Sequence, residues 1–326
     1  MKQFFLLSVA ATLTCSISFA KVWRVNNNGG VAANFTSAQA AHDATAVLAG
    51  DTIHLEPSII SYGGLSTQKR LTWISTGGFL SNYPNEQFSP NAGRIDGLTA
   101  VGGSSNSVFH IFINGAANID ANNIRLDRCF VAGSINLGGY QTATGTALVV
   151  INCWVQDNVS INQGNNNIVT NNIIGNTING TNALTVYTHN VINAISAGAA
   201  TVVNAIVENN IFNKTSSAYT FTNCTVQFNM SGAAAILPAG GNNQNSVAMA
   251  NVFVNNSGTF DGAFVLKAGS PAIGAGSAGA DMGAFGGGST FKLALQPAIP
   301  AIYKIQAPAA PAGNTLNVTF STKSNN

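Results

Sequence analysis

The chain has 326 residues, of which 46% are hydrophobic and only 7% are charged, with a formal net charge of +2 at pH 7. The basic residues are scattered and form no basic run, so composition argues against nucleic-acid binding. Because asparagine is very abundant and 34 residues are glycine, we expect side-chain amides, hydroxyls and backbone groups, and not charged side chains, to hydrate the protein surface.

Residues 1–20 have the pattern of an export signal. Lys2 gives a positive start, an apolar stretch follows, and Ser18-Phe19-Ala20 form a small-x-small cleavage site. Lipid attachment at Cys15 is an alternative that fits less well, since Thr14 replaces the small residue usual before that cysteine. No later segment reaches the roughly twenty apolar residues of a membrane span, so we expect a secreted or cell-surface protein.

Residues 21–93 are predicted to form an N-terminal cap and the first coils of a repeat. Apolar or small residues at three- and four-residue spacing predict a helix from about residue 35, which Asn34 or Thr36 could cap. Gly50 suits a left-handed helix end, and the alternation in residues 51–55 predicts a strand. We interpret the helix as a cover over the otherwise unpaired end of a sheet.

A repeat with a period of roughly twenty residues runs through residues 94–264 and predicts the fold. Its marker is a small polar residue followed by an apolar one: Cys129-Phe130, Cys153-Trp154, Asn172-Ile173, Asn190-Val191, Asn210-Ile211, Asn229-Met230 and Asn251-Val252. A right-handed parallel β-helix explains the period, because each coil lies about 4.8 Å above the last and like residues stack. We predict an all-β solenoid of roughly eight to eleven coils, an asparagine ladder and an interior filled by the apolar members of these pairs.

An antiparallel sandwich is the structural alternative, and it would place short hairpins at intervals of roughly eight to twelve positions along the chain. The longer period of this chain, with its irregular insertions, favours three short strands per coil.

Residues 265–290 interrupt the asparagine pattern and contain Ser270-Pro271-Ala272-Ile273 followed by DMGAFGG at 281–287. This segment resembles the closing coil of secreted bacterial β-helix proteins in the pectate-lyase-like superfamily, and AGDTIHLEP at 49–57 resembles their opening segment. That opening normally continues with Pro-Gly-x-Tyr, where this chain has Pro57-Ser58 and a later Tyr62. The resemblance implies the architecture and a closing coil at 265–290.

The last segment, residues 291–326, begins with a Pro- and Ala-rich stretch and then alternates from Thr315 to Phe320. We expect a linker and then a strand or hairpin packed on the final coil. A surface-sorting signal is the functional alternative.

Enzymes of this superfamily include polysaccharide lyases and glycosidases. The lyases use an Arg or Lys as base and acidic residues that bind calcium, whereas the glycosidases use clustered carboxylates. Between residues 129 and 260 the only charged residues are Asp157, Glu208 and Lys214, and the lyase and hydrolase signature motifs are missing. The face that carries the active site in these enzymes is therefore predicted to be catalytically inactive in this chain.

One concentration of charge provides candidate catalytic residues: Asp96, Asp120, Arg125, Asp127 and Arg128, with Arg94 nearby. Asp96 and Asp120 lie one coil length apart in the sequence and could stack one above the other. We favour a salt bridge cluster over the alternative of a calcium or catalytic site at Asp96 and Asp120, and we expect no other cofactor.

Aromatic residues and cysteines give further expectations. Trp73 and Tyr83 lie in less periodic sequence and are candidates for exposed binding residues, whereas Trp154 is expected in the core and His189 in a turn. Cys129 and Cys153 share the ladder position one coil apart, so their Cα atoms are expected within disulfide range. Whether the disulfide forms stays open.

The leading functional hypothesis is a noncatalytic secreted or surface protein that binds polysaccharides or surface proteins through amide-rich faces. The alternative is a polysaccharide lyase or glycoside hydrolase with an atypical site near Asp96 and Asp120. Ice binding is a third hypothesis, disfavoured because the threonines are scattered.

Overall fold

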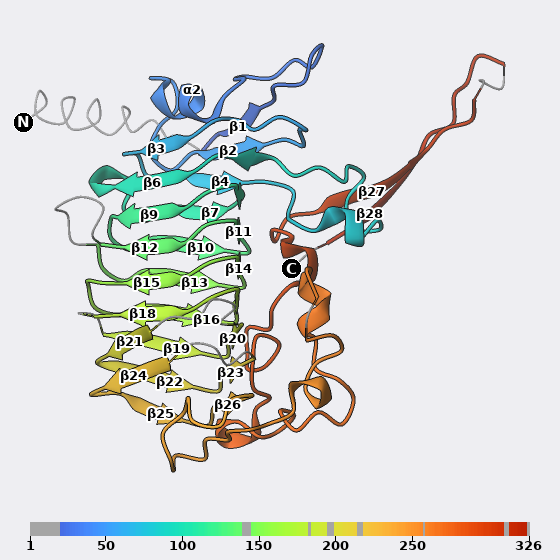
Figure 1. Ribbon diagram of the computed structural model, residues 1–326. Helices are drawn as coiled ribbons and strands as arrows, with labels where there is room; N and C mark the ends of the chain where they lie inside the picture. The colour runs from blue at the N-terminus through green and yellow to red at the C-terminus, as the bar shows by residue number, and fades with distance from the viewer. Residues whose placement is uncertain are drawn as a thin grey trace, which may run out of the picture.

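The computed structural model describes residues 20–138, 145–181, 184–193, 199–213, 218–256, 258–309 and 313–324. The chain forms a right-handed parallel β-helix of about nine turns, as the repeat predicts (Figure 1). The predicted export signal lies outside the described residues, apart from Ala20. None of the described helices has the length and apolarity that crossing a membrane requires.

Three parallel sheets, here called A, B and C, form the walls of the solenoid. Sheet A contains β1 Val22–Val25, β2 Thr52–Leu55, β4 Thr72–Ile74, β7 Val108–His110, β10 Arg125–Asp127, β13 Val149–Ile151, β16 Asn167–Thr170, β19 Thr185–Thr188, β22 Ala205–Glu208 and β25 Thr225–Gln227. Sheet B contains β3 Leu65–Thr67, β6 Leu98–Val101, β9 Ala117–Asp120, β12 Ile135–Leu137, β15 Val159–Ile161, β18 Ile178–Gly180, β21 Ala199–Val203 and β24 Ala218–Thr222. Sheet C contains β5 Arg94–Ile95, β8 Phe112–Ile113, β11 Phe130–Val131, β14 Trp154–Val155, β17 Ile173–Ile174, β20 Val191–Ile192, β23 Ile211–Phe212 and β26 Met230–Ser231.

The N-terminal end of the solenoid carries the predicted cap. The helix α2 spans Ala38–Asp43 and contacts β1 and β3 (Figure 1). Its N-cap is Ser37, whose hydroxyl accepts the Ala40 N–H, in place of the predicted Asn34 or Thr36. Gly50 has the expected left-handed backbone (φ 99°), and β2 follows it.

A buried asparagine ladder runs along the turns between sheets A and C. Asn172, Asn190, Asn210 and Asn229 are fully buried, and each Oδ1 accepts the backbone N–H of the ladder residue one coil before it, at 2.8–3.0 Å. Their Nδ2 groups donate to backbone carbonyls, so the buried amides are satisfied on both sides. The ladder thus links successive coils where no strand pairing exists.

Asn251, the fifth predicted member, is not in the ladder. It is exposed and ends the 3₁₀ helix η3 Met249–Asn251. Asn243 takes its place, because the coil after Asn229 is only partial and brings the next asparagine into register after 14 residues. Asn243 Oδ1 accepts the Asn229 N–H at 3.1 Å, and its Nδ2 donates to the Val226 carbonyl at 2.8 Å.

The left-handed turn residue is the one that precedes each ladder position. Six such residues have φ between 51° and 59°: Arg128, Asn152, Asn171, His189, Asn209 and Phe228. Asparagine is favoured at left-handed positions, which explains the repeated Asn-Asn pairs at 171–172 and 209–210.

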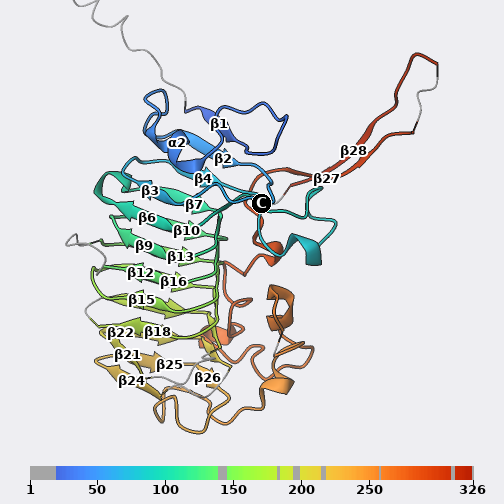
Figure 2. The ribbon, with the colours of Figure 1, turned by 45° about the horizontal axis from the view of Figure 1, so that its top comes forward.

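The apolar residues beside the ladder lie outside the solenoid interior, so the prediction that they fill it was wrong. Phe130, Trp154, Ile173, Val191, Ile211 and Met230 belong to a second hydrophobic cluster, separate from the interior core. They form a column on the outer face of sheet C, and residues of 249–256 and 258–295, here called the strap, pack over that column. The backbone of the strap runs beside sheet C (Figures 1 and 2). Sequence periodicity cannot separate these cases, because both leave the residue buried.

The predicted closing segment 265–290 belongs to the strap and adds no further coil. It contributes Ala272, Met282 and Ala284 to the second cluster, and Asn171 Nδ2 donates to the carbonyls of Ala284 and Gly286. The strap contains the 3₁₀ helices η3, η4 Asp261–Phe264, η5 Ser277–Gly279 and η6 Leu293–Leu295. Two further 3₁₀ helices, η1 Leu80–Asn82 and η2 Gly102–Ser104, lie earlier in the chain.

The tail forms an antiparallel hairpin of β27 Ala301–Gln306 and β28 Thr319–Lys323. The hairpin was expected on the final coil, but it projects from the body of the molecule (Figures 1 and 2). Its base contacts the segment after η1, where the Phe88 N–H donates to the Ile302 carbonyl and Lys323 pairs with Glu86.

Candidate functional site

The carboxylates of Asp96 and Asp120 do not stack. Asp96 is exposed and follows β5 of sheet C, whereas Asp120 is 3% exposed and ends β9 of sheet B, opposite Val101. The coil at this point is shorter than the spacing of the two aspartates, because Ile95 already pairs with Ile113. The predicted catalytic or calcium site at this pair therefore has no geometric basis.

The remaining charged candidates form a structural ion-pair group. Asp127 Oδ2 accepts from Arg125 at 2.8 Å, and Arg128 Nε lies 3.8 Å from Asp127 Oδ1. Arg128 also donates to the Gln296 carbonyl at 2.9 Å, which joins the solenoid to the chain after the strap. Arg94 is not part of this group and donates to the Ile59 carbonyl.

Acid and histidine side chains elsewhere do not form a metal-binding group in the part of the chain that the structure describes. His110 Nδ1 lies 2.8 Å from the Asp127 carbonyl, and burial lowers its pKa. His189 sits in the expected turn beside Gly286 and Gly287 of the strap, and burial lowers its pKa as well. His110 therefore contacts the backbone of sheet A, and His189 packs against the backbone of the strap.

Neither of the predicted aromatic binding residues has the exposed side chain that was expected. Trp73 is fully buried in the solenoid interior, because β4 points it inward within sheet A. Tyr83 is partly buried, and its hydroxyl donates to Asp261 Oδ1 at 2.7 Å. Trp154 is buried as expected, although it lies beneath the strap.

The stacked cysteines are free thiols. The Cys129 N–H points at Cys153 Sγ across 3.4 Å, so one sulfur takes the acceptor role that asparagine Oδ1 plays elsewhere in the ladder. Cys129 Sγ itself donates to the Phe109 carbonyl at 3.0 Å. Burial raises the pKa of Cys153 well above its ordinary value, which disfavours the reactive thiolate.

The most regular candidate surface is the outer face of sheet B. The central outward position of each strand carries a short uncharged side chain with an amide or hydroxyl group. We call this set the polar column: Ser66, Thr99, Asn118, Asn136, Ser160, Asn179, Thr201 and Thr220. Strand register stacks these residues about 4.8 Å apart along the solenoid axis.

Hydrogen bonds hold parts of this surface in fixed orientations. Asn136 Nδ2 donates to Asn118 Oδ1 at 2.9 Å within the column. Beside it, Asn179 Nδ2 donates to Thr177 Oγ1 at 2.9 Å, and Thr177 donates to Asn158 Oδ1 at 2.6 Å. The only charged residue within the described strands of sheet B is Asp120, which is almost fully buried.

The polar column was not predicted from the sequence, although a signal exists. Most strands of sheet B contain an apolar, polar, apolar triplet, such as Leu98-Thr99-Ala100, Ile135-Asn136-Leu137 and Val159-Ser160-Ile161. The irregular loop lengths hide the alignment until the register of the coils is known.

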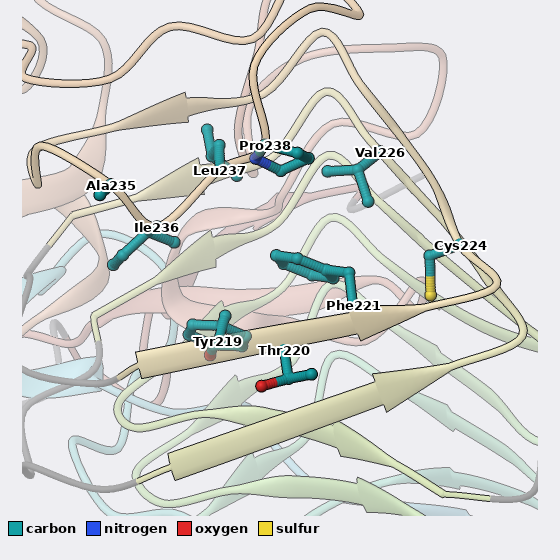
Figure 3. Close-up of a pocket in the computed structure, with 9 residues that line it drawn as sticks. All are labelled: Tyr219, Thr220, Phe221, Cys224, Val226, Ala235, Ile236, Leu237 and Pro238. Atoms are coloured by element: carbon teal, nitrogen blue, oxygen red, sulfur yellow. The ribbon is translucent and has the colours of Figure 1, made fainter.

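A pocket of about 520 Å³ lies at the C-terminal end of the solenoid (Figure 3). Tyr219, Phe221, Cys224 and Val226 of the last coil form one wall, and residues 235–238 form the other. Residues 233–240 pass across this end without forming a strand, so sheet B ends at β24.

Comparison of the chain with protein family models, curated proteins and solved structures finds no match.

Proposed function

We propose that this is a noncatalytic secreted or cell-surface protein that binds an uncharged glycan along the polar column of sheet B. The observation that carries the proposal is the unbroken series of eight uncharged hydrogen-bonding side chains on one sheet face. Rigid strands hold these groups in place, so binding orders few side chains. The export pattern in residues 1–20 supports a location outside the cell, and the resemblance to secreted β-helix proteins supports a bacterial origin.

The chemistry of the face favours a neutral glycan over other partners. Amides and hydroxyls pair with sugar hydroxyls, but the described strands of sheet B provide no cation to pair with the carboxylate of an acidic sugar. The column also lacks the large apolar or aromatic anchors that dominate protein–protein interfaces. Threonine occupies three of the eight positions, Thr99, Thr201 and Thr220, so the regular threonine array of an ice-binding face is missing.

The proposal is tested by measuring the binding of the chain from Lys21 onward to an array of neutral and acidic polysaccharides. We expect binding to a neutral polysaccharide, and the double variant Asn118→Ala/Asn136→Ala should weaken it roughly 5- to 100-fold, as expected for two lost hydrogen bonds. The control Thr72→Ala/Thr225→Ala removes hydroxyls from sheet A and should leave binding unchanged. Equal losses in both double variants, or no glycan binding, would contradict the proposal.

The same incubations test the enzymatic alternative. Release of reducing or unsaturated sugar ends, abolished by Asp120→Ala, would replace the noncatalytic function by a lyase or glycosidase activity.

A further inference from the structure

We propose that the chain assembles head to tail, with residues 315–318 of a second copy adding a strand to the free edge of β24. This inference goes beyond glycan binding and concerns two other surface elements: the pocket at the C-terminal end and the projecting hairpin.

Sheet B is incomplete at its C-terminal end. The partial coil after Ser231 is hydrogen-bonded to the last coil just after β25 and at β26, since the Phe228 N–H donates to the Gly241 carbonyl and the Ser231 N–H to the Gln244 carbonyl, each at 2.7 Å. No strand in the described residues pairs with the outer edge of β24. The pocket of about 520 Å³ lies between β24 and residues 235–238, which cross this end of the solenoid without forming a strand.

The edge strand β24 lacks the features that normally prevent strand addition. Its sequence Ala-Tyr-Thr-Phe-Thr contains no charge, no proline and no glycine. Tyr219 and Phe221 stack on each other in the pocket wall, with ring centroids 5.6 Å apart, and remain partly exposed. An extended segment could therefore pair with the backbone of β24 and cover these rings.

The hairpin region carries a segment with the pattern that sheet B uses. Leu316-Asn317-Val318 repeats the apolar, polar, apolar triplet of Ile135-Asn136-Leu137, and Leu316 and Val318 are 52% and 40% exposed. In the register of sheet B, Asn317 would extend the polar column while Leu316 and Val318 enter the pocket. Neither the segment nor the pocket lining carries a charge, so pairing leaves no unpaired charge buried.

The positions of the two elements require a second copy. The hairpin leaves the molecule near the first coils, where its base contacts Glu86 and Phe88, whereas the pocket lies at the last coil (Figures 1 and 3). A contact between two different surfaces of identical chains is heterologous, so repetition gives linear chains of molecules.

Sedimentation of the intact chain tests this assembly. The wild type should form oligomers whose mean mass rises between about 1 and 100 µM. Val318→Glu in the donor segment and Ala235→Trp in the pocket wall should each self-associate at least tenfold more weakly than the wild type and remain monomeric over this range. Ile305→Glu, an equally exposed hairpin residue, and Ala234→Trp, an exposed neighbour outside the pocket lining, should assemble like the wild type.

Mixing the two monomeric variants gives the decisive test of the proposed contact. Val318→Glu keeps an intact pocket and Ala235→Trp keeps an intact donor, so their mixture should give a dimer that grows no further. A wild type that stays monomeric, oligomers that persist in Val318→Glu, or a mixture that remains monomeric would each overturn the proposal. These outcomes are independent of glycan binding, which the Asn118 and Asn136 variants report.

Discussion

Asn210 shows how much one ladder side chain contributes. Its Oδ1 accepts the Asn190 N–H at 2.9 Å and its Nδ2 donates to the Tyr187 carbonyl at 2.8 Å, all within the core. Asn210→Ala leaves these buried groups without partners and should lower the free energy of unfolding by about 2–4 kcal/mol. Asn251→Ala, at the exposed position outside the ladder, should change it by less than about 0.5 kcal/mol. Urea unfolding of both variants measures the difference, and equal effects would contradict the ladder.

Asp261 makes stability depend on pH. It is fully buried and accepts hydrogen bonds from Tyr83 Oη and the Ala294 N–H, both at 2.7 Å, while burial raises its pKa. A raised pKa means that the folded chain holds the proton more tightly than the unfolded chain does. The resulting stabilisation is complete below the unfolded pKa and is lost as pH rises through the folded pKa.

The variant Asp261→Asn removes this titration. The unfolding free energy of the wild type minus that of Asp261→Asn should therefore decrease as pH rises from about 3 to about 7. Urea titrations at several pH values check the sign. A difference that increases with pH would show that the hydrogen bonds from Tyr83 and Ala294 outweigh burial.

The three cysteines of the described chain should react at different rates. Cys224 is partly exposed, whereas Cys129 and Cys153 are fully buried free thiols. A thiol reagent should therefore modify one cysteine rapidly in the folded protein and three after unfolding. Intact mass measurements before and after reduction check this count, and a mass change of two hydrogens on reduction would indicate a disulfide.

Among the elements, the strap is the layer whose loss would change the surface most. Phe264 is 2% exposed and packs on Trp154 and Phe253, with ring centroids 5.8 and 5.5 Å apart. Phe264→Ala should cost about 3–5 kcal/mol of strap docking and leave the interior core intact. Hydrogen exchange should rise across residues 258–295 and stay slow in β16 and β19. The control Val254→Ala, at a 63% exposed strap position, should leave exchange unchanged; uniform acceleration in Phe264→Ala would contradict separate layers.

Elements differ in how far the sequence predicts them. The coil period and the stacked asparagines follow from the spacing of Asn172, Asn190 and Asn210, because stacking repeats the same environment in every coil. The strap was not predicted, since its glycine-rich segment has no periodicity and Trp154 or Met230 is equally buried under either arrangement. Trp73 was misplaced for a related reason: inside a three-residue strand, no pattern distinguishes inward from outward.

At the scale of the whole molecule, the fold could be predicted and the candidate site could not. The site depends on which residues face outward from sheet B, and loops of variable length between coils separate Asn118 from Asn136 and Ser160 by unequal stretches of sequence. Catalysis usually needs charged residues, which is why Asp96 and Asp120 were candidates, yet Asp96 follows a strand of sheet C and Asp120 ends a strand of sheet B. The proposed functional surface instead consists of common uncharged residues in a regular array.

The central claim is that eight polar residues lie in one straight line on a single sheet face, and a distance between spin labels tests it most directly. Labels on Ser66→Cys and Thr220→Cys, with Cys224 replaced by serine, mark the two ends of the polar column. Seven steps of about 4.8 Å predict a narrow distribution centred near about 34 Å, apart from the length of the labels. A distance below about 25 Å, or a broad distribution, would contradict the stacked register on which the column depends.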